Sequence, residues 1–486
     1  MRPVGAVPDF DIHPACPIPH MQYDRTILHV AHLGAFHIAM LFCLLVTLFL
    51  GVLAVNCTSF IIYSPAGADW LRKNCPIVTG HVAIGPLNDN STTQHISLDG
   101  VEVIEGSFGN YYVDRWNTLD GQPYFTLSSS TLREVRGEVE FGTSPTKLQS
   151  LTLPNLKIVN TSFQVGFYAR DITYLDISSL ESVDYFSLAA PNITTFRHRS
   201  LRNATDVKVH TTQIDSLDIV SDSRLKINSV DLAGPFPNIK NIPVGFTSAE
   251  ELFISADASV TLGGPSTTNM TIGSLSLSGG VSDLKRSTKL ESLRVDSMDL
   301  SSSISIPHLE IPFDNLRALT LKQLYEAHPV KDITLPPQAV NWTGGFELDI
   351  SNAPELNLTS MYRTDDQNNR VQTWYWPTNI SSIRISNANL GNAFLYSDTF
   401  VAQQNASLGS TRSPSVLETF HVYPSRNTTG FNCAALNGLS KTGRLPSPPF
   451  GFGCSNSTKT SGSTFIRTAS PLHLAGVVFG ATMWMV

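Results

Sequence analysis

The chain has 486 residues, of which 42% are hydrophobic and 15% are charged, and its formal net charge is −7 at pH 7. That hydrophobic content excludes a chain that is disordered throughout. A net negative charge without a cluster of basic residues argues against nucleic acid as a partner.

The N-terminus predicts export from the cell. Residues 27–55 are mostly apolar and include Ala54 with a valine two positions earlier, the small residues that a signal peptidase reads. We therefore expect residues 1–54 to be an N-terminal extension and signal peptide that is removed. Because the segment before the apolar run is Pro-rich and weakly basic, Met21 and Met40 are alternative starts. An uncleaved signal anchor over the same run is the alternative to cleavage.

Four cysteines lie in the part that would be retained, two near each end: Cys57, Cys75, Cys433 and Cys454. Each pair would close a short local loop, which suits disulfides made in an oxidising compartment. We expect local pairing within each pair, with crossed connectivity as the alternative. No CxxC or HxxxH accompanies these thiols, so we expect no metal and no cofactor.

An aliphatic pattern recurs along the middle of the chain. Each copy has an aliphatic residue, two others, a second aliphatic, one other and a third, except one copy in which Phe196 and His198 take the last two positions. The copies are Leu148/Leu151/Leu153, Ile172/Leu175/Ile177, Ile193/Phe196/His198, Ile214/Leu217/Ile219, Ile272/Leu275/Leu277, Leu290/Leu293/Val295, Leu316/Leu319/Leu321 and Ile380/Ile383/Ile385. A period in the low twenties is typical of a solenoid, in which each turn of chain adds one short strand to a growing parallel sheet.

The period also predicts which residues are neighbours on successive turns. Val159 returns 24 residues later as Val183, and Val135 precedes Val159 by the same 24 residues. Ile104 lies a further 31 residues before Val135. Since alternate residues of a strand share one face, the aliphatic positions would point into the coil and the residues between them outward.

We therefore expect a mainly all-β fold over residues 55–432, a right-handed parallel β-helix or leucine-rich-repeat-like solenoid. Solenoid ends expose sheet edges and need caps. The disulfide-bounded segments 57–75, with a helix-like stretch over residues 68–73, and 433–454 are the candidates. A β-sandwich with coincidental spacing is the alternative.

The C-terminus predicts a lipid anchor. Residues 472–486 carry no charge, but a transmembrane helix needs about 20 apolar residues and usually has basic residues after them. The small residues of 461–463 and a mostly polar spacer over 464–471 precede this tail. That order is the signal for a glycosylphosphatidylinositol (GPI) anchor. A short tail anchor in a cytosolic protein is the alternative.

Anchor attachment is expected at Ser461, with Asn456 and Gly462 as alternatives, because Ser463 then supplies a small residue two positions later. Residues 455–463 would form a short Ser/Thr-rich stalk, and residues 464–486 would be removed.

N-glycosylation sequons are more frequent than the composition would give by chance. The chain has twelve sequons, but the one at Asn56 lies too near the expected cleavage point for a glycan to be expected there. The asparagines that we expect to carry glycans are Asn90, Asn160, Asn192, Asn203, Asn269, Asn341, Asn357, Asn379, Asn405, Asn427 and Asn456.

Few residues indicate chemistry. Asp365-Asp366 and Glu250-Glu251 are adjacent carboxylates, but the first pair reads as a solvated loop and the second as a surface pair. No nucleophile elbow, zinc-protease motif or P-loop is present, so we expect no catalytic residue. Trp374 and Trp376 are candidate glycan-binding residues, since they would share one face of an extended segment; packing in the core or a cap is the favoured interpretation.

Several segments together carry a family likeness. Cys57, the strand-like stretch after Cys75, Gly-Val-Glu-Val-Ile-Glu-Gly-Ser-Phe at 100–108, Leu-Arg-Glu-Val-Arg-Gly at 132–137 and Leu-Glu-Ser-Val at 180–183 look like the opening of a receptor L-domain. Over residues 55–486 the chain resembles the fungal GPI-anchored cell-wall organisation proteins. The resemblance implies an ectodomain of receptor L-domain type and a non-enzymatic surface glycoprotein needed for cell-wall organisation, integrity and morphogenesis.

Three functional hypotheses follow. The first is that wall-organising glycoprotein, located in the outer leaflet of the plasma membrane through a GPI lipid, in the cell wall, or both, with wall polysaccharide as a candidate partner. The second is a surface receptor or adhesin that binds a glycan or a protein on the solenoid face. The third is a wall glycan hydrolase or transglycosylase, which would need two carboxylates about 5 to 9 Å apart in a groove.

Overall fold

The chain divides into two units, residues 1–56 and 57–486, and all described residues belong to the second. The computed structural model describes residues 57–87, 93–110, 123–142, 147–199, 201–210, 213–221, 225–301, 304–323, 329–364, 367–395, 417–425, 428, 431–443 and 445–455.

The second unit is mainly β, and its largest sheet has 19 strands. They are β1 (Phe60–Ile62), β2 (Ile77–Val78), β3 (Val82–Ile84), β5 (Val103–Ile104), β6 (Phe108–Asn110), β8 (Glu134–Val135), β9 (Val139–Phe141), β11 (Ile158–Val165), β13 (Ser182–Leu188), β15 (Asp206–His210), β16 (Lys226–Ala233), β18 (Ser248–Ser255), β20 (Asn269–Ser278), β22 (Ser292–Ser301), β24 (Asn315–Lys322), β26 (Phe346–Leu358), β29 (Ile380–Leu390), β30 (Thr419–Tyr423) and β31 (Phe452–Cys454).

Smaller sheets and short helices complete the described part. A five-stranded sheet contains β4 (Gln94–Ser97), β7 (Phe125–Ser128), β10 (Leu148–Thr152), β12 (Tyr174–Asp176) and β14 (Thr195–Arg197). Further sheets pair β17 (Asn241–Val244) with β19 (Ser259–Leu262) and β21 (Asp283–Arg286), β23 (His308–Glu310) with β25 (Asp332–Thr334), and β27 (Tyr362–Thr364) with β28 (Arg370–Gln372). The helices are α2 (Pro65–Asn74), the 3₁₀ helix η1 (Pro337–Asn341), α3 (Asn392–Leu395) and α5 (Ala434–Lys441).

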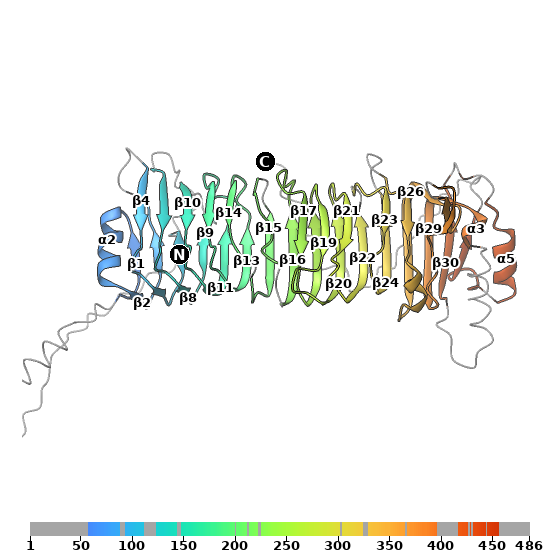
Figure 1. The fold of residues 1–486 in the computed structure, drawn as a ribbon, viewed down its shortest axis with the longest axis horizontal. Coiled ribbons are helices and arrows are strands. Elements are labelled where there is room, and N and C mark those ends of the chain that lie inside the picture. The colour runs from blue at the N-terminus through green and yellow to red at the C-terminus, as the bar shows by residue number, and fades with distance from the viewer. Residues whose placement is uncertain are drawn as a thin grey trace, which may run out of the picture. The chain divides into compact units, whose positions relative to one another are not determined.

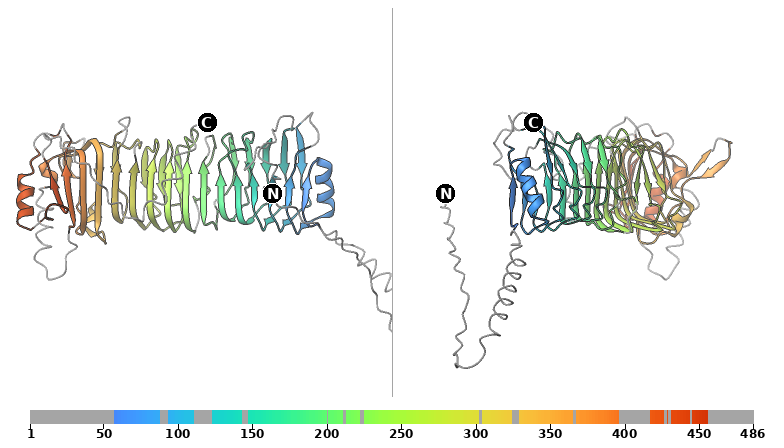
Figure 2. Two further views of the ribbon diagram at one scale, coloured as in Figure 1. Left: turned by 180° about the vertical axis from the view of Figure 1, so that it is seen from behind. Right: turned by 60° about the vertical axis from the view of Figure 1, so that its left-hand side comes forward.

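The expected parallel solenoid is confirmed. Strands of the large sheet succeed one another in chain order, so that the colour runs from blue to red along the stack (Figure 1). Among the strand pairs of the described residues, only β27 with β28 is antiparallel. This hairpin projects from the side of the stack (Figure 2). The alternative of a sandwich of antiparallel sheets is therefore wrong.

The predicted register is also confirmed. Ile104 is the partner of Val135, Val135 of Val159, and Val159 of Val183. The spacing of 31 residues in the first step spans a longer turn of the same coil. All four side chains are buried, with exposures of 1% or less.

The recurring aliphatic triplets are buried throughout, but they do not belong to one sheet. Leu151 lies in β10 of the five-stranded sheet, whereas Leu275 and Leu319 lie in β20 and β24 of the large sheet. Most turns of the coil contribute one strand to the large sheet and one to a smaller sheet, and these sheets share one core. Because both sheets need alternating inward aliphatics, the same spacing suits either, and the single strand per repeat that the sequence suggested is a simplification.

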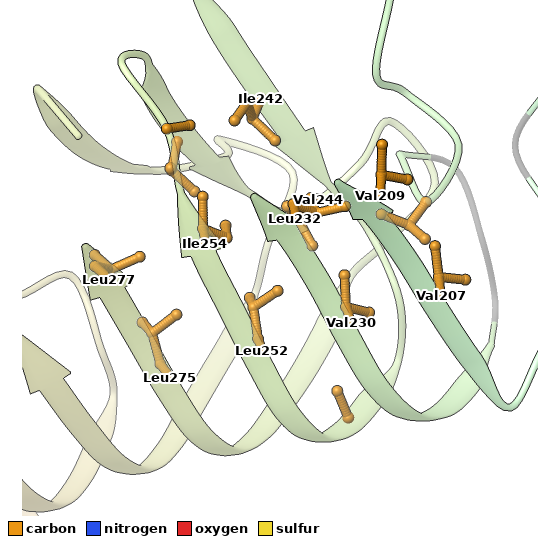
Figure 3. Packing of buried hydrophobic residues seen from close by; sticks show 14 of the residues in the cluster. Val207, Val209, Val230, Leu232, Ile242, Val244, Leu252, Ile254, Leu275 and Leu277 are labelled. Carbon is orange, nitrogen blue, oxygen red and sulfur yellow. The ribbon is translucent and has the colours of Figure 1, made fainter. Parts of the chain in front are cut away.

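The core consists of columns of aliphatic side chains that run along the stack (Figure 3). One column contains Val207, Val230, Leu252 and Leu275, which are register partners on four successive strands. A second contains Val209, Leu232, Ile254 and Leu277. Ile242 and Val244 of β17 approach the second column from the other sheet (Figure 3). Such burial is the main favourable contribution to folding.

Both ends of the stack carry a disulfide, as expected, and each end also carries a helix. Cys57 is bonded to Cys75 and Cys433 to Cys454, each pair with a Cα–Cα distance of 5.9 Å. The crossed connectivity is therefore wrong. At the N-terminal end α2 buries Leu71, and its first turn is capped by the Ser64 hydroxyl, which accepts from the backbone N–H of Gly67.

The capping segments are continuous with the solenoid. β1 lies inside the first disulfide loop and pairs with β3, and β31 lies inside the second and pairs with β30. The helix α5, which the sequence did not predict, begins directly after Cys433 and buries Leu436. Segment 433–454 thus adds a strand of the large sheet as well as a cap. Among the described residues, no helix combines the length and apolar character needed to cross a membrane.

Candidate functional site

A polar cavity of about 210 Å³ lies where the hairpin β27–β28 leaves the stack. Its walls come from β25, the end of β26, β27 of the hairpin, the segment that follows β28, and α3. The lining residues are Asp332, Ile333, Asn357, Leu358, Thr359, Ser360, Tyr362, Arg363, Thr364, Thr373, Trp374 and Phe394. The combination of hydroxyl, amide, carboxylate, guanidinium and aromatic groups is the chemistry that recognises polyhydroxylated molecules such as sugars.

Two long strands bend shortly before the chain leaves the stack. Asn352 and Asn387 have φ of 53° and occupy equivalent positions in β26 and β29. Asparagine tolerates this left-handed conformation, so both long strands turn at the same place. β26 then continues to Leu358, and the chain departs into the hairpin. It returns at Thr373, whose backbone N–H donates to Met361 O at 2.9 Å.

Charged groups at the cavity come from successive turns of the coil. The Asp332 carboxylate is 2.5 Å from His308 Nδ1, and the two residues are register partners in β25 and β23. Arg363 of the hairpin places Nη1 3.7 Å from the same carboxylate. None of these three residues was predicted from the sequence. The signal that could have found two of them is the spacing of 24 residues between His308 and Asp332, one period of the coil.

The hairpin presents an aromatic ring supported by a cation. Arg370 lies over the Tyr362 ring, 4.0 Å from its centroid, and Tyr362 is 37% exposed. This cation–π contact restricts the orientation of the Tyr362 ring, so little conformational entropy remains to be lost when a ligand packs on it.

Trp374 and Trp376 are not an exposed glycan platform. Their exposed fractions are 1% and 0%, and their ring centroids lie 4.9 and 5.2 Å from that of Phe394. A sugar ring stacks only on an accessible face, so the candidate glycan-binding role by stacking is corrected to core packing, the interpretation that the sequence favoured. One polar feature remains at Trp374. Its indole N–H is buried and has no hydrogen-bond partner in the described part of the chain.

The sequon asparagines that the structure describes share one property. All seven are exposed, as a glycan requires: Asn160, Asn192, Asn203, Asn269, Asn341, Asn357 and Asn379. Of these, only Asn357 is among the lining residues of the cavity.

Several sequence predictions lie outside the described residues. They are the extension and signal peptide of 1–54, the anchor residue Ser461 with most of its stalk, the anchor signal of 464–486, the pair Asp365-Asp366, and Asn56, Asn90, Asn405, Asn427 and Asn456. Glu250 and Glu251, in contrast, are described, and both are exposed on β18.

One carboxyl group has an unusual environment away from the cavity. Burial raises the pKa of Asp299 in β22, Lys322 opposes this shift and Asp349 adds to it. Its Oδ1 is buried and makes no hydrogen bond to any residue that the structure describes. Thr320 lies between Asp299 and Asp349 in the register, so the two carboxylates are two strands apart. Within the described residues, no group of three or more His, Cys, Asp or Glu side chains is placed to hold a metal ion.

A second hollow lies between the smaller sheets. A cavity of about 660 Å³ is lined by residues of β21 and β23, and Arg286 is one of them. Its guanidinium donates to Asp314 Oδ1 at 2.8 Å and to the backbone oxygen of Glu291 at 2.8 Å. Arg286 therefore stabilises the packing of neighbouring turns through these hydrogen bonds.

Compared with protein-family models, curated proteins and solved structures, the chain matches none of them.

Proposed function

We propose that the chain is a non-enzymatic, GPI-anchored cell-surface glycoprotein that contributes to fungal cell-wall organisation, integrity and morphogenesis. The observation that carries this proposal is the disulfide-closed solenoid. Two disulfides, one at each end of the stack, are typical of proteins that fold in an oxidising compartment. The exposed sequon asparagines support the same compartment.

The finer assignment of the fold belongs to the same proposal. We take the solenoid to be right-handed and of the receptor L-domain type. The role in the cell wall rests on the resemblance of residues 55–486 to wall organisation proteins. The mature protein would then reside at the outer leaflet of the plasma membrane, in the wall, or in both, with wall polysaccharide as its neighbour.

Enzymatic release from intact cells tests the anchor. Phosphatidylinositol-specific phospholipase C should release the protein into the medium, and a variant that lacks residues 464–486 should be secreted without the enzyme. Loss of the gene should make cells sensitive to wall-binding dyes, and the full chain, but not the shortened one, should restore resistance. Retention on phospholipase-treated cells from which the wall has been digested would contradict the anchor. A deletion strain with normal dye resistance would contradict the wall role.

A second candidate function is a surface receptor or adhesin that binds a glycan. The polar cavity beside the hairpin favours it, because its lining combines an aromatic ring with hydrogen-bonding groups. Substitution of the buried Trp374 would disturb packing, so the exposed residues are the better test. Binding on a glycan array that is lost in Tyr362→Ala and Arg363→Ala would favour the receptor; an array without binding would exclude it for the glycans displayed.

A further inference from the structure

We propose that the cavity beside the hairpin β27–β28 holds the first sugar of an N-linked glycan carried by Asn357. This inference rests on the proposed function, in which the chain passes through a glycosylating compartment. It adds a structural role for one particular glycan and an occupant for the cavity, which would then not be open to the ligand glycan of the second candidate function.

The attachment point is oriented by its own sequon. Asn357 Oδ1 accepts hydrogen bonds from the backbone N–H of Thr359 at 3.1 Å and from its hydroxyl at 2.6 Å. Both oxygen contacts fix the side-chain amide, and Nδ2, the atom that carries the sugar, makes no hydrogen bond to a described residue. Asn357 and Thr359 both line the cavity. A sugar on Nδ2 therefore begins at the cavity wall.

The lining suits an N-acetylhexosamine. Its hydroxyl and acetamido groups both donate and accept, and the cavity offers the Ser360 and Thr364 hydroxyls, the Asp332 carboxylate and the Arg363 guanidinium. Tyr362, held by Arg370, supplies an apolar ring at the same wall. Hydrogen bonds from the sugar to the Asp332 carboxylate or the Arg363 guanidinium would be stronger than those to neutral groups.

The unpaired indole N–H of Trp374 points to the same occupant. A buried donor without an acceptor destabilises the folded protein, and buried polar groups are rarely left in this state. Trp374 lines the cavity. A sugar oxygen would accept from this N–H and remove the penalty once the wall at Trp374 shifts to admit it, because the indole nitrogen is closed to solvent in the unglycosylated protein.

The experiment compares three forms of the full chain secreted from a glycosylating host. They are the wild type, the wild type trimmed by an endoglycosidase to a single N-acetylglucosamine at each site, and Asn357→Gln. Asn160→Gln is the matched control, since Asn160 is also an exposed sequon on the large sheet but does not line the cavity. Glycopeptide mass spectrometry measures the occupancy of each site, and hydrogen exchange measures the protection of β27 and β28.

We expect Asn357 to be occupied and the hairpin to exchange roughly tenfold faster in Asn357→Gln, because several hydrogen bonds to the sugar are lost. Trimming to one sugar and Asn160→Gln should leave exchange of the hairpin unchanged. Exchange in Asn357→Gln equal to that of the wild type would overturn the inference, and so would protection that depends on the outer sugars.

A double-mutant comparison tests the contact with Trp374. Trp374→Phe removes the N–H, so it should lower the unfolding temperature more in the glycosylated protein than in the Asn357→Gln background, by about 1 °C or more. Equal losses in the two backgrounds would contradict the contact. An Asn357 that is unoccupied while the other sequons carry glycans would sink this inference alone, whereas a chain without glycans at every sequon would contradict the proposed function as well.

Discussion

The orientation of two adjacent residues in β18 provides a direct test of the coil. Leu252 is 1% exposed and lies in the inner column between Val230 and Leu275 (Figure 3). Phe253 follows it, is 37% exposed, and has the outward neighbour Asp231 as a register partner. Side-chain size alone would predict that loss of the phenylalanine is the more harmful change. The structure predicts the reverse.

The expected magnitudes follow from burial. Leu252→Ala removes methyl groups from the inner column, where Val230 and Leu275 pack on either side of the leucine. Such substitutions reduce the free energy of unfolding by about 2–5 kcal/mol. Phe253→Ala changes a partly solvated position on the outer face, where the preference for an aromatic residue in a strand is worth about 1 kcal/mol.

Urea unfolding followed by circular dichroism measures both variants against the wild type, and unchanged slopes would show that the midpoints report stability. Because a solenoid can unfold turn by turn, hydrogen exchange in β16, β18 and β20 supplies the local measurement. A loss of stability in Phe253→Ala that equals or exceeds that of Leu252→Ala would refute the assignment of inner and outer faces.

Three further predictions concern single groups. Because burial raises the pKa of the Asp299 carboxyl, its ionised form destabilises the folded state at neutral pH. Asp299→Asn should therefore raise the thermal midpoint at pH 7. The gain in the free energy of unfolding should be less than about 1 kcal/mol, because solvent screens the charge, and it should vanish in acid. A difference that persists or grows at low pH would contradict this environment. Burial also lowers the pKa of His198, which is packed on Phe196 at an inward position, so the folded state resists protonation. Stability should therefore decrease as the pH falls below about 6.5, by up to about 1.4 kcal/mol per pH unit, and His198→Ile should flatten that part of the stability profile; an unchanged profile would refute the burial. Replacing Cys433 and Cys454 together by Ser should reduce stability by about 3 kcal/mol and increase hydrogen exchange first in α5 and β31, whereas loss of protection at the opposite end of the stack would be inconsistent with a local cap.

The sequence predicted the coil well because burial in a solenoid is periodic. The partners of Val159 could be named from a spacing of 24 residues, since each turn of chain brings the same position back to the core. Local pairing of the cysteines was expected because each pair closes a short loop in a chain predicted to be exported, and the structure decides against the crossed alternative. The helix α2 was also expected, although it spans Pro65–Asn74 and not only the predicted stretch of 68–73.

Other features could not be read from the period. The triplets containing Leu151 and Leu275 have the same spacing but lie in different sheets, because both sheets impose the same alternation. Trp374 and Trp376 alternate in the same way whether they face a ligand or the core, and only the position of Phe394 decides between the two. The cavity depends on where the chain leaves the stack, which no repeat predicts.

Mass spectrometry of the mature polypeptide tests the central claim most directly, namely that this capped solenoid is processed at both ends and displayed on the cell surface by a lipid. We predict an N-terminus at Val55, a C-terminal peptide that ends at Ser461 with a glycosylphosphatidylinositol group, and glycans at the exposed sequons. A mature chain that retains residues 464–486 and carries no glycan would contradict the account.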